Sequence, residues 1–438
     1  MKHTFKGGFH IHDYKELTNS NSTIAAPDFD EHIFPLRQHI GAELMPLVSV
    51  GDYVKVGQKI ADSDAFVSAP VHSSISGTVT AIKSFLHPNG NKINTIFIQN
   101  DKLYTIDESV KPISDIENLS KEEMLNIVRE KGIVGMGGAG FPTFIKLNPQ
   151  KKIDYVLVNG AECEPYITSD HRIMLENPTE LIEGLKIAMK ILSLDKGYFG
   201  IEANKKDAIK NLQEALADTP QITIKVLKTK YPQGGEKQLI KAITGRSVPS
   251  GKLPADVGVV VLNIYTVYCI AKAFREGLPP INRIVTVTGD CVKKPKNINV
   301  RLGVPYSFLF DLAGGFSKEP QKIISGGPMM GMAQFSLDAP VIKTTSSLIA
   351  FSEVPQVFDK SMPCIRCGKC VDNCPMHLLP LKIAQAALSE NYNLAKKLNA
   401  TDCLDCGLCS YICPSNRNPV EFIRRAKKTI TAKNQGGK

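Results

Sequence analysis

The sequence predicts a multidomain protein in which α/β and α+β units follow one another along the chain. Its 438 residues are enough for about three domains of roughly 150 residues each. Short strands and glycine turns occupy residues 1–110, whereas helix-like and strand-like segments alternate from there to about Gly277. Near the C-terminus one cysteine spacing occurs twice, which indicates a further unit with its own chemistry.

Residues 1–110 are predicted to form a β domain. The stretch from Val48 to Gln58 alternates around glycine turns, and the stretch from Ala69 to Val79 repeats this style. The pattern resembles the barrel-sandwich domains of biotinyl and lipoyl carriers. Those carriers present a modifiable lysine at a hairpin tip, whereas Ser63 to Ser76 contains no lysine. We therefore expect a structural or docking module and not a swinging-arm carrier.

Residues 111–280 are predicted to form an α/β domain. Ser120 and Glu123 have the spacing of a capping box at the start of an amphipathic helix. The β-branched run from Ile153 to Val158 predicts a strand. The stretch from Val257 to Phe274 is interrupted by polar residues, so it predicts a buried strand followed by a helix and not a membrane span.

Two further domains are predicted, over residues 281–345 and residues 355–438. In the first, Arg283 to Asp290 predicts a strand, and Val304 to Ala313 predicts the helix of a small β-grasp unit. The stretch from Thr344 to Pro355 is expected to be a linker. The second consists of helices around the cysteines.

Eight cysteines near the C-terminus predict two [4Fe-4S] clusters. Each run has the spacing C-x-x-C-x-x-C-x-x-x-C and is followed by a proline, as in two-cluster ferredoxins, where the fourth cysteine of each run binds the other cluster. The predicted ligand sets are Cys364, Cys367, Cys370 with Cys413, and Cys403, Cys406, Cys409 with Cys374. Paired C-x-x-C units also form zinc sites, so zinc is the alternative.

A glycine run in the α/β domain contains G-x-G-x-x-G at Gly135, Gly137 and Gly140. The dinucleotide fingerprint follows a strand, whereas this run follows a predicted helix, so the pattern alone fits a structural loop equally well. Glycines nevertheless let a backbone approach a flat ring or a phosphate closely. With Gly138, Phe141 and the later Lys146, the run resembles the flavin loop of the NADH-oxidising flavoprotein subunit of respiratory complex I.

The resemblance continues downstream. Residues 159–165 are similar to that family's Asn-Ala-Asp-Glu-Gly-Glu-Pro segment, with Ala161 in place of the Asp and Cys163 in place of a Gly. Residues 234–236 are similar to its Gly-Glu-Glu turn, and residues 261–266 to its Val-Asn-Asn-Val-Glu-Thr segment near the FMN phosphate. The cofactor-binding residues that the resemblance implies are Gly135, Gly137, Gly138, Gly140, Phe141, Lys146, Asn159, Glu236, Asn263 and Thr266.

In that family the glycines face FMN and the Phe stacks on the nicotinamide nucleotide, which implies the same for this loop and Phe141. Glu162 and Glu164 are the implied catalytic pair, which would orient the carboxamide and shape the flavin environment. Solvated loop carboxylates are the alternative for these two glutamates. The thiol of Cys163 is a weaker redox candidate.

The order of the domains carries the resemblance further. A barrel-sandwich domain, a Rossmann-like FMN-binding α/β domain, a soluble-ligand-binding β-grasp (SLBB) domain and a two-cluster ferredoxin domain together resemble the C subunits of Rnf complexes. The resemblance implies an ion-translocating ferredoxin:NAD oxidoreductase in which FMN exchanges hydride with NAD(H) and two clusters relay single electrons. It also implies Rnf subunits as partners and a peripheral place on the cytoplasmic face of the membrane.

Two other functions are compatible with these motifs. One is a soluble NADH dehydrogenase with another acceptor. The other is an electron-wire and docking subunit with a vestigial flavin pocket, which Ala161 favours.

The net charge of +10 is concentrated near the cysteines. From Asp359 to the end there are 13 Lys/Arg against 6 Asp/Glu. A solvated helix face, an anionic membrane surface and an acidic protein partner all fit this excess. No motif for nucleic acid accompanies the charge, so no nucleic-acid partner is expected.

Overall fold

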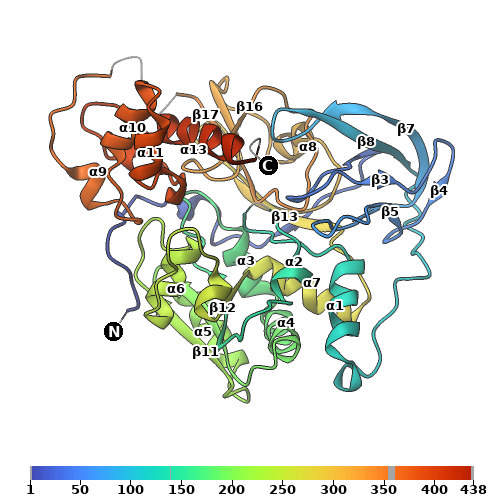
Figure 1. Ribbon diagram of the computed structural model, residues 1–438. Helices are drawn as coiled ribbons and strands as arrows, with labels where there is room; N and C mark the ends of the chain where they lie inside the picture. The colour runs from blue at the N-terminus through green and yellow to red at the C-terminus, as the bar shows by residue number, and fades with distance from the viewer. Residues whose placement is uncertain (1, 139, 354–360, 436–438) are drawn as a thin grey trace.

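A computed structural model describes residues 2–138, 140–353 and 361–435 (Figure 1). Residue 355, where the ferredoxin domain is predicted to begin and the expected linker to end, lies outside these ranges, as does Ala139 of the glycine run. Besides the elements named below, short 3-10 turns lie at Lys15–Leu17, Ile116–Asn118, Pro254–Val257 and Ala400–Asp402.

The N-terminal β domain consists of two sheets, as predicted for a barrel sandwich. Their strand orders are β2-β8-β7-β4 and β3-β5-β6. The strands are β2 (Glu31–Pro35), β3 (Met45–Pro46), β4 (Tyr53–Val54), β5 (Lys59–Asp62), β6 (Val71–His72), β7 (Gly77–Leu86) and β8 (Lys92–Asn100). Phe34, Ile60 and Ile96 are buried in one core, because alternate residues of each strand point to the same face.

Residues before β2 run along two other domains, the α/β domain and the β-grasp unit. His3 forms a β-bridge with Leu227, and Phe9 forms one with Tyr231, both in the α/β domain. Strand β1 (Ile24–Ala25) then pairs with β14 of the β-grasp unit. The N-terminal segment therefore ties distant parts of the chain together. The domain boundaries drawn from the sequence stay predictions.

The α/β domain is built on a parallel sheet of order β11-β10-β9-β12. Its elements are α1 (Lys121–Glu130), α2 (Thr143–Lys146), β9 (Tyr155–Gly160), α3 (Ser169–Glu176), α4 (Pro178–Ile191), β10 (Gly197–Glu202), α5 (Lys206–Ala215), β11 (Ile222–Leu227), α6 (Glu236–Thr244), β12 (Val259–Asn263) and α7 (Ile264–Arg275). The chain moves outward from β9 to β10 and β11, and then returns to the other side of β9. Strands β9 and β12 therefore flank a topological switch point, where ligands of α/β proteins bind.

Local sequence signals of this domain are confirmed. Ser120 accepts from the backbone N–H of Glu123, and the Glu123 side chain accepts from that of Ser120, so the capping box is present. Strand β12 passes directly into α7, with Asn263 as the N-cap residue. The stretch that could be mistaken for a membrane span is thus a strand and a helix. In the described part of the chain, no helix is long and apolar enough to cross a membrane.

The β-grasp unit is a six-stranded sheet of order β1-β14-β13-β17-β15-β16 with one helix. Its later elements are β13 (Asn282–Thr288), β14 (Lys296–Arg301), α8 (Tyr306–Leu312), β15 (Lys322–Ser325), β16 (Met332–Gln334) and β17 (Ser347–Phe351). The prediction of a linker at Thr344–Pro355 is wrong for Ser347–Phe351. These residues form β17, a fully buried strand between β13 and β15. Its apolar run of four residues, 348–351, does not alternate, so it carries no period that distinguishes a central strand from a linker.

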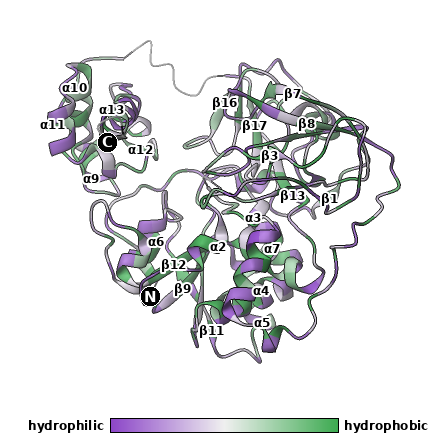
Figure 2. Cartoon of the chain, turned by 45° about the vertical axis from the view of Figure 1, so that its right-hand side comes forward, coloured by the Kyte–Doolittle hydropathy of each residue, from purple (hydrophilic) through white to green (hydrophobic). Residues whose placement is uncertain are grey.

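The ferredoxin domain is a small helical body. Its helices are α9 (Lys369–Asp372), α10 (Pro380–Leu388), α11 (Tyr392–Lys397), α12 (Leu408–Tyr411) and α13 (Pro419–Gln435). Ile383, Ala387, Ile423 and Ala426 form its core between α10 and α13. In Figure 2 these helices form a group apart from the β-rich units, and α6 of the α/β domain lies near them.

A close helix contact in the α/β domain generates a prediction. A Cβ on Gly184 in α4 would overlap the carbonyl oxygen of Val267 in α7. Gly184→Ala is therefore expected to lower the free energy of unfolding by about 1–3 kcal/mol, measured by urea unfolding with circular dichroism. Lys186→Ala on the exposed face of α4 is the control, expected to change it by less than about 0.5 kcal/mol. Equal stabilities of the two variants would contradict the prediction.

Candidate functional site

Two predicted cofactor-binding residues meet at the switch point. Asn159 and Asn263 are direct register partners at the carboxyl ends of β9 and β12. The Asn159 Nδ2 donates to the carbonyl oxygen of Gly234 at 2.8 Å. The Asn263 Oδ1 accepts from the Tyr265 N–H at 2.8 Å, and its Nδ2 donates to Asp170 Oδ2 at 2.8 Å. Both side chains are thus held rigidly at the edge where a ligand is expected.

The glycine run forms a closed loop over this edge. The Gly135 N–H donates to the Phe141 carbonyl at 2.9 Å, and Val134 forms a β-bridge with Pro142. A Cβ on Gly137 would overlap the Asn263 side chain, so the loop packs directly on that residue. A Cβ on Gly138 would meet no atom within 4 Å. At Gly138 the bare backbone therefore faces open space, as binding of a flat ring or a phosphate requires.

Thr266 holds this loop from below. Its hydroxyl accepts from the Met136 N–H at 2.9 Å and donates to the Val134 carbonyl at 3.1 Å. The side chain is fully buried. Thr266 therefore contributes to the site through the shape of the loop.

Lys146 and Glu236 form an ion pair beside β12. The Lys146 Nζ lies 2.8 Å from Glu236 Oε1 and donates to the Val261 carbonyl at 3.2 Å. Both side chains are about one third exposed. The pair joins α2, directly after the glycine loop, to the N-terminus of α6. The structure thus brings these two predicted residues together, and Phe141 is half-buried just before α2.

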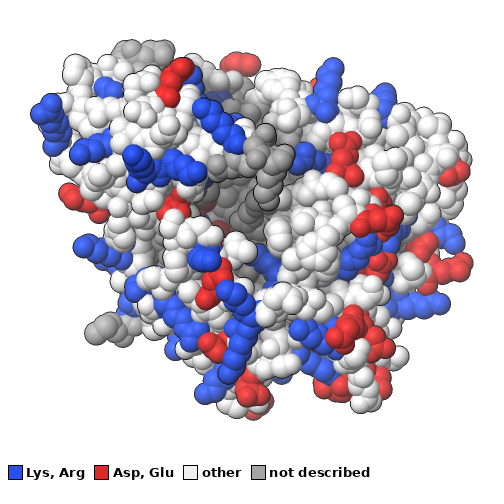
Figure 3. Space-filling view, viewed as in Figure 1, with Lys and Arg blue, Asp and Glu red and all other residues white. Residues whose placement is uncertain are grey.

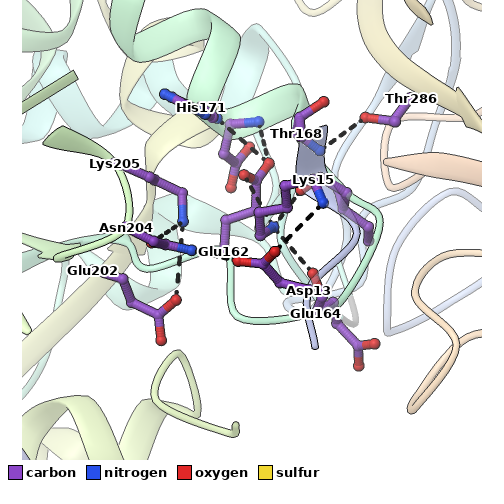
Figure 4. A network of polar contacts seen from close by, with 12 residues as sticks. Asp13, Lys15, Glu162, Glu164, Thr168, His171, Glu202, Asn204, Lys205 and Thr286 are labelled. Atoms are coloured by element: carbon purple, nitrogen blue, oxygen red, sulfur yellow. Dashed lines mark hydrogen bonds and ion pairs between the residues drawn. The ribbon is translucent and has the colours of Figure 1, made fainter. Parts of the chain in front are cut away.

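Glu162 is turned toward α3 (Figure 4). Its Oε1 accepts from the N–H of Asp170 at 2.6 Å, and its Oε2 lies 3.6 Å from the Lys15 Nζ. The side chain is only 4% exposed. A carboxylate at a helix N-terminus is stabilised by the unpaired N–H groups there. Glu162 is thus bonded to the first turn of α3, and its catalytic assignment stays a prediction.

Glu164 lies where three domains meet. Its Oε2 accepts from the Met329 N–H at 3.1 Å, and its Oε1 lies 3.4 Å from the Tyr231 hydroxyl. That hydroxyl donates to the carbonyl of Cys406 at 2.8 Å. A Cβ on Gly327 would overlap the carboxylate, so the β-grasp loop wraps it with bare backbone. Burial raises the pKa of Glu164 to about 7.

Four buried charges that sequence reasoning missed surround these glutamates. Lys15, from the N-terminal segment, donates to the carbonyls of Ile167 and Glu164. Lys205 donates to the Ala161 carbonyl at 2.7 Å and lies 3.9 Å from Glu202. Burial raises the pKa of Glu202 to about 7 and lowers the pKa of Lys205.

The fourth of these charges is Asp170, the acceptor for the Asn263 amide. Burial, and then the charge of Glu162, raise the pKa of Asp170 to about 6. Glu202 and Lys205 could have been found from their place at the end of β10, at the same sheet edge. The long-range partners of Lys15 have no signal in the spacing.

The four cysteines predicted to bind one of the clusters lie around one cavity. Cys374, Cys403, Cys406 and Cys409 line a single cavity, together with apolar residues such as Leu408. The backbone N–H groups of Leu378 and Asp405 donate to the sulfurs of Cys374 and Cys403 at 3.4 Å. Such N–H bonds to sulfur are a means by which proteins set cluster potentials. We call this group of four cysteines the inner set.

The other predicted group of four, which we call the outer set, is more exposed. Cys370 lies near enough to Cys367 and Cys413 for their charges to raise its pKa, after the larger effect of burial. The Arg366 N–H donates to the sulfur of Cys364 at 3.3 Å. Cys367 is exposed, and the nearby Ile365 is 67% exposed. The ligand assignments of both sets stay predictions.

In the described part of the chain, the loops of the inner set are bonded to the α/β domain. Besides the bond from Tyr231, the Gln238 Nε2 of α6 donates to the carbonyl of Pro375, next to Cys374, at 3.0 Å. The Gly8 N–H of the N-terminal segment donates to the Asn373 carbonyl at 3.0 Å. The ligand loops of the inner set are thus fixed to the α/β domain.

Some of the basic side chains near the cysteines form hydrogen bonds inside the ferredoxin domain. Lys and Arg side chains are spread over that domain at the upper left of Figure 3. The Lys427 Nζ donates to the Cys403 carbonyl at 2.7 Å and to Asp405, and Arg424 donates to the Asp405 carbonyl at 2.8 Å. Lys427 and Arg424 therefore stabilise the loop of Cys403 and Asp405, which belongs to the inner set. Arg425, in contrast, forms an exposed ion pair with Glu390.

Cys163 does not have the environment of a reactive thiol. Its sulfur accepts from the Gly234 N–H at 3.3 Å. Burial raises its pKa, with further contributions from the charges of Glu202 and Glu164. The thiol is therefore held in its protonated form, whereas nucleophilic cysteines have a lowered pKa.

The buried Asp170 generates a prediction on pH dependence. Because its pKa is raised from 3.8 to about 6, the folded protein retains a proton in this pH range that the unfolded chain releases. Stability from this residue is therefore lost as the pH rises from 3.8 to about 6. Relative to Asp170→Asn, the wild-type free energy of unfolding should fall by about 1–2 kcal/mol between about pH 5 and about pH 8.

Urea unfolding at the two pH values measures this difference. Asp195→Asn, at an exposed position, is the control and should follow the wild type. If Asp170→Asn shows the wild-type pH dependence as well, the inferred protonation of Asp170 is wrong.

Comparison with known proteins agrees with this architecture. Four family models match successive parts of the chain: the RnfC barrel sandwich hybrid domain at residues 3–103, the Nuo51 FMN-binding domain at 128–272, the SLBB domain at 284–333 and the 4Fe-4S dicluster domain at 363–417. A solved NAD+-reducing [NiFe]-hydrogenase in its air-oxidized state is similar in fold, with a TM-score of 0.51 and 19% identity over 70% of this chain and 63% of its own.

Two curated relatives cover nearly the whole chain. The C subunit of the Na(+)-translocating ferredoxin:NAD(+) oxidoreductase complex of Acetobacterium woodii is 46% identical over 100% of this chain and 99% of its own length. The C subunit of the proton-translocating ferredoxin:NAD(+) oxidoreductase complex of Clostridium ljungdahlii is 46% identical over 97% of this chain and 93% of its own. The chain therefore belongs to the family of C subunits of ion-translocating ferredoxin:NAD+ oxidoreductase complexes, the Rnf family.

Proposed function

We propose that this subunit exchanges electrons with NAD(H) at FMN and relays them singly through two [4Fe-4S] clusters to other Rnf subunits. Its place would be peripheral, on the cytoplasmic face of the membrane. The observation that carries the proposal is the inner set. Four cysteines line one cavity, and their loops are bonded to the domain whose switch point carries the glycine loop. The chain thus joins a flavin-type site to a cluster site.

The residues at the switch point fit FMN. Gly138 faces open space, Gly137 allows the loop to lie on Asn263, and Thr266 sets the loop conformation. FMN, when bound, would accept two electrons together and release them one at a time. The chain's own task is to hold the ring and phosphate by the loop backbone, with Lys146 and Glu236 beside it.

We propose that Phe141 provides the stacking surface for NAD(H). Glu162 and Glu164 would act at two different places in the site. Glu162 would act through α3, since its carboxylate is bonded to the first turn of that helix. Glu164 would act at the boundary with the clusters, since it shares Tyr231 with the Cys406 loop. Ala161, where complex I carries Asp, contributes its carbonyl to Lys205 instead of a carboxylate.

The inner and outer sets have different tasks in this proposal. Because the loops of the inner set contact the α/β domain, its cluster would exchange electrons with the flavin site. The exposed Cys367 and its neighbours would exchange electrons with another Rnf subunit. Arg425 and Lys428 on α13 would face an anionic membrane surface or an acidic subunit.

An anaerobic NADH titration of the reconstituted chain tests the proposal directly. About eight irons and one FMN per chain, with clusters reduced by NADH, are the expected result. Eight irons with no flavin and no response to NADH would leave only the electron-wire function with a vestigial pocket. Co-purification with membrane subunits separates the Rnf function from a soluble dehydrogenase.

The proposed order of the two sets generates a prediction with two matched variants. Cys374→Ser should remove the inner cluster, and Cys413→Ser should remove the outer one, each leaving about four irons per chain. NADH should still reduce the cluster that remains in Cys413→Ser. In Cys374→Ser it should bleach the flavin absorbance but reduce the remaining cluster far more slowly, as followed by EPR after rapid freezing. If NADH reduced the remaining cluster at the same rate in both variants, the proposal that the inner cluster receives electrons from the flavin first would be wrong.

A further inference from the structure

We infer that Arg283, which belongs to the β-grasp unit, is a positioning residue for the glycine loop of the flavin site. The inference deepens the proposed function and rests on it for the identity of the ligand. Arg283 lies on β13 and is completely buried. A buried arginine far from the cofactor motifs in sequence needs a structural reason, because burying a charge is costly unless it is well paired.

The guanidinium of Arg283 reaches across the domain boundary. Its Nη2 donates to the carbonyl of Met136 at 2.8 Å, and its Nε donates to the carbonyl of Thr345 at 2.8 Å. The group also lies over the ring of Tyr265, 4.0 Å from its centroid. Arg283 thus connects the β-grasp unit, the glycine loop and the first turn of α7.

The peptide groups of Met136 are held from two sides. Thr266 of the α/β domain accepts from the Met136 N–H, and Arg283 of the β-grasp unit donates to its carbonyl. Met136 precedes Gly137, which packs on Asn263, and Gly138, which faces open space. The direction of the loop N–H groups toward a ligand is therefore set jointly by the two domains.

A second route links Arg283 to the same loop. The charge of Arg283 lowers the pKa of Asp170, against the larger effect of burial. Asp170 in turn holds the Asn263 amide against which Gly137 lies. Among the described residues, Arg283 Nη1 and Asp170 Oδ1 are both buried without a hydrogen-bond partner. Each of these two atoms is thus free to bond a water or a polar ligand group.

The planar fork of arginine explains the residue type. One guanidinium donates to two carbonyls and stacks on a ring at once, whereas a lysine ammonium is a compact point charge that cannot reproduce all three contacts. The β-grasp unit therefore has a task in this chain beyond connecting two domains. It completes the backbone conformation on which flavin binding depends.

Two substitutions of Arg283 in the full-length chain test the inference, with one matched control. The variants are Arg283→Met and Arg283→Lys. The control is Arg301→Met, because Arg301 of the same unit also lies over a ring, that of Tyr104 at 4.2 Å, and donates to a backbone carbonyl, that of Ser74 at 2.6 Å. Its carbonyl partner is in the N-terminal β domain and not in the glycine loop.

Two readouts are measured. Hydrogen exchange of a peptide that spans residues 133–142, without FMN, reports the loop itself. The dissociation constant of FMN reports its consequence. Arg283→Met should speed exchange in this peptide and weaken FMN binding by about tenfold or more, since hydrogen bonds to a charged group contribute about 1.5–3 kcal/mol and about 1.4 kcal/mol is tenfold. Arg283→Lys should restore part of both, and Arg301→Met should change neither.

Wild-type exchange of the loop peptide in both Arg283 variants would overturn the inference. If Arg283→Met does not fold, Arg283→Lys provides the test. Wild-type hydrogen exchange of the loop peptide in Arg283→Lys would then overturn the inference. If hydrogen exchange of the loop peptide is equally fast in Arg301→Met and Arg283→Met, Arg283 has only a general structural role. That result would also overturn the inference. A wild-type chain that does not bind FMN would instead contradict the proposed function, while the exchange readout would still test the loop contact.

Discussion

The parallel pairing of β9 with β12 is the constraint on which the candidate flavin site depends. It sets Asn159 and Asn263 side by side at one edge of the sheet. Because α7 begins directly after Asn263, the same pairing places Thr266 under the glycine loop. Because the chain leaves β9 toward Glu162, it also brings the acidic segment to this edge. The position of the site thus follows from strand order, as for other ligands at a switch point.

Buried polar groups, and not an apolar core alone, hold the domains to one another. Lys15, Tyr231 and the segment that carries Glu162 and Glu164 are far apart in the chain and meet where the α/β, β-grasp and ferredoxin units contact one another. Removing one member of such a buried set leaves its partner uncompensated, which is more damaging than loss of an exposed pair. Directional bonds of this kind specify one relative placement of the domains, which electron transfer over short distances requires.

The ferredoxin domain is asymmetric although its two cysteine runs are alike. The inner set lies against the α/β domain and is braced by Lys427 and Arg424, whereas the outer set reaches solvent through Cys367. The duplicated spacing therefore serves two environments, one internal and one external. Some of the basic residues support the inner set and others lie on the surface, which is why charge counting could not decide their function.

Several parts of this protein were predictable because their signals are local in the sequence. Cysteine spacing indicated the clusters, the capping box placed α1, and the glycine loop with its neighbours indicated a flavin site. Other features became visible only in the folded chain: Glu162 bonds to the first turn of α3, Arg283 and Lys15 reach the site from other segments, and Ser347–Phe351 is a central strand. Most of these contacts join residues far apart in the chain, or pair a short strand by hydrogen bonds to distant neighbours. Local spacing and periodicity carry no record of such partners, because the partners are chosen by how the domains pack.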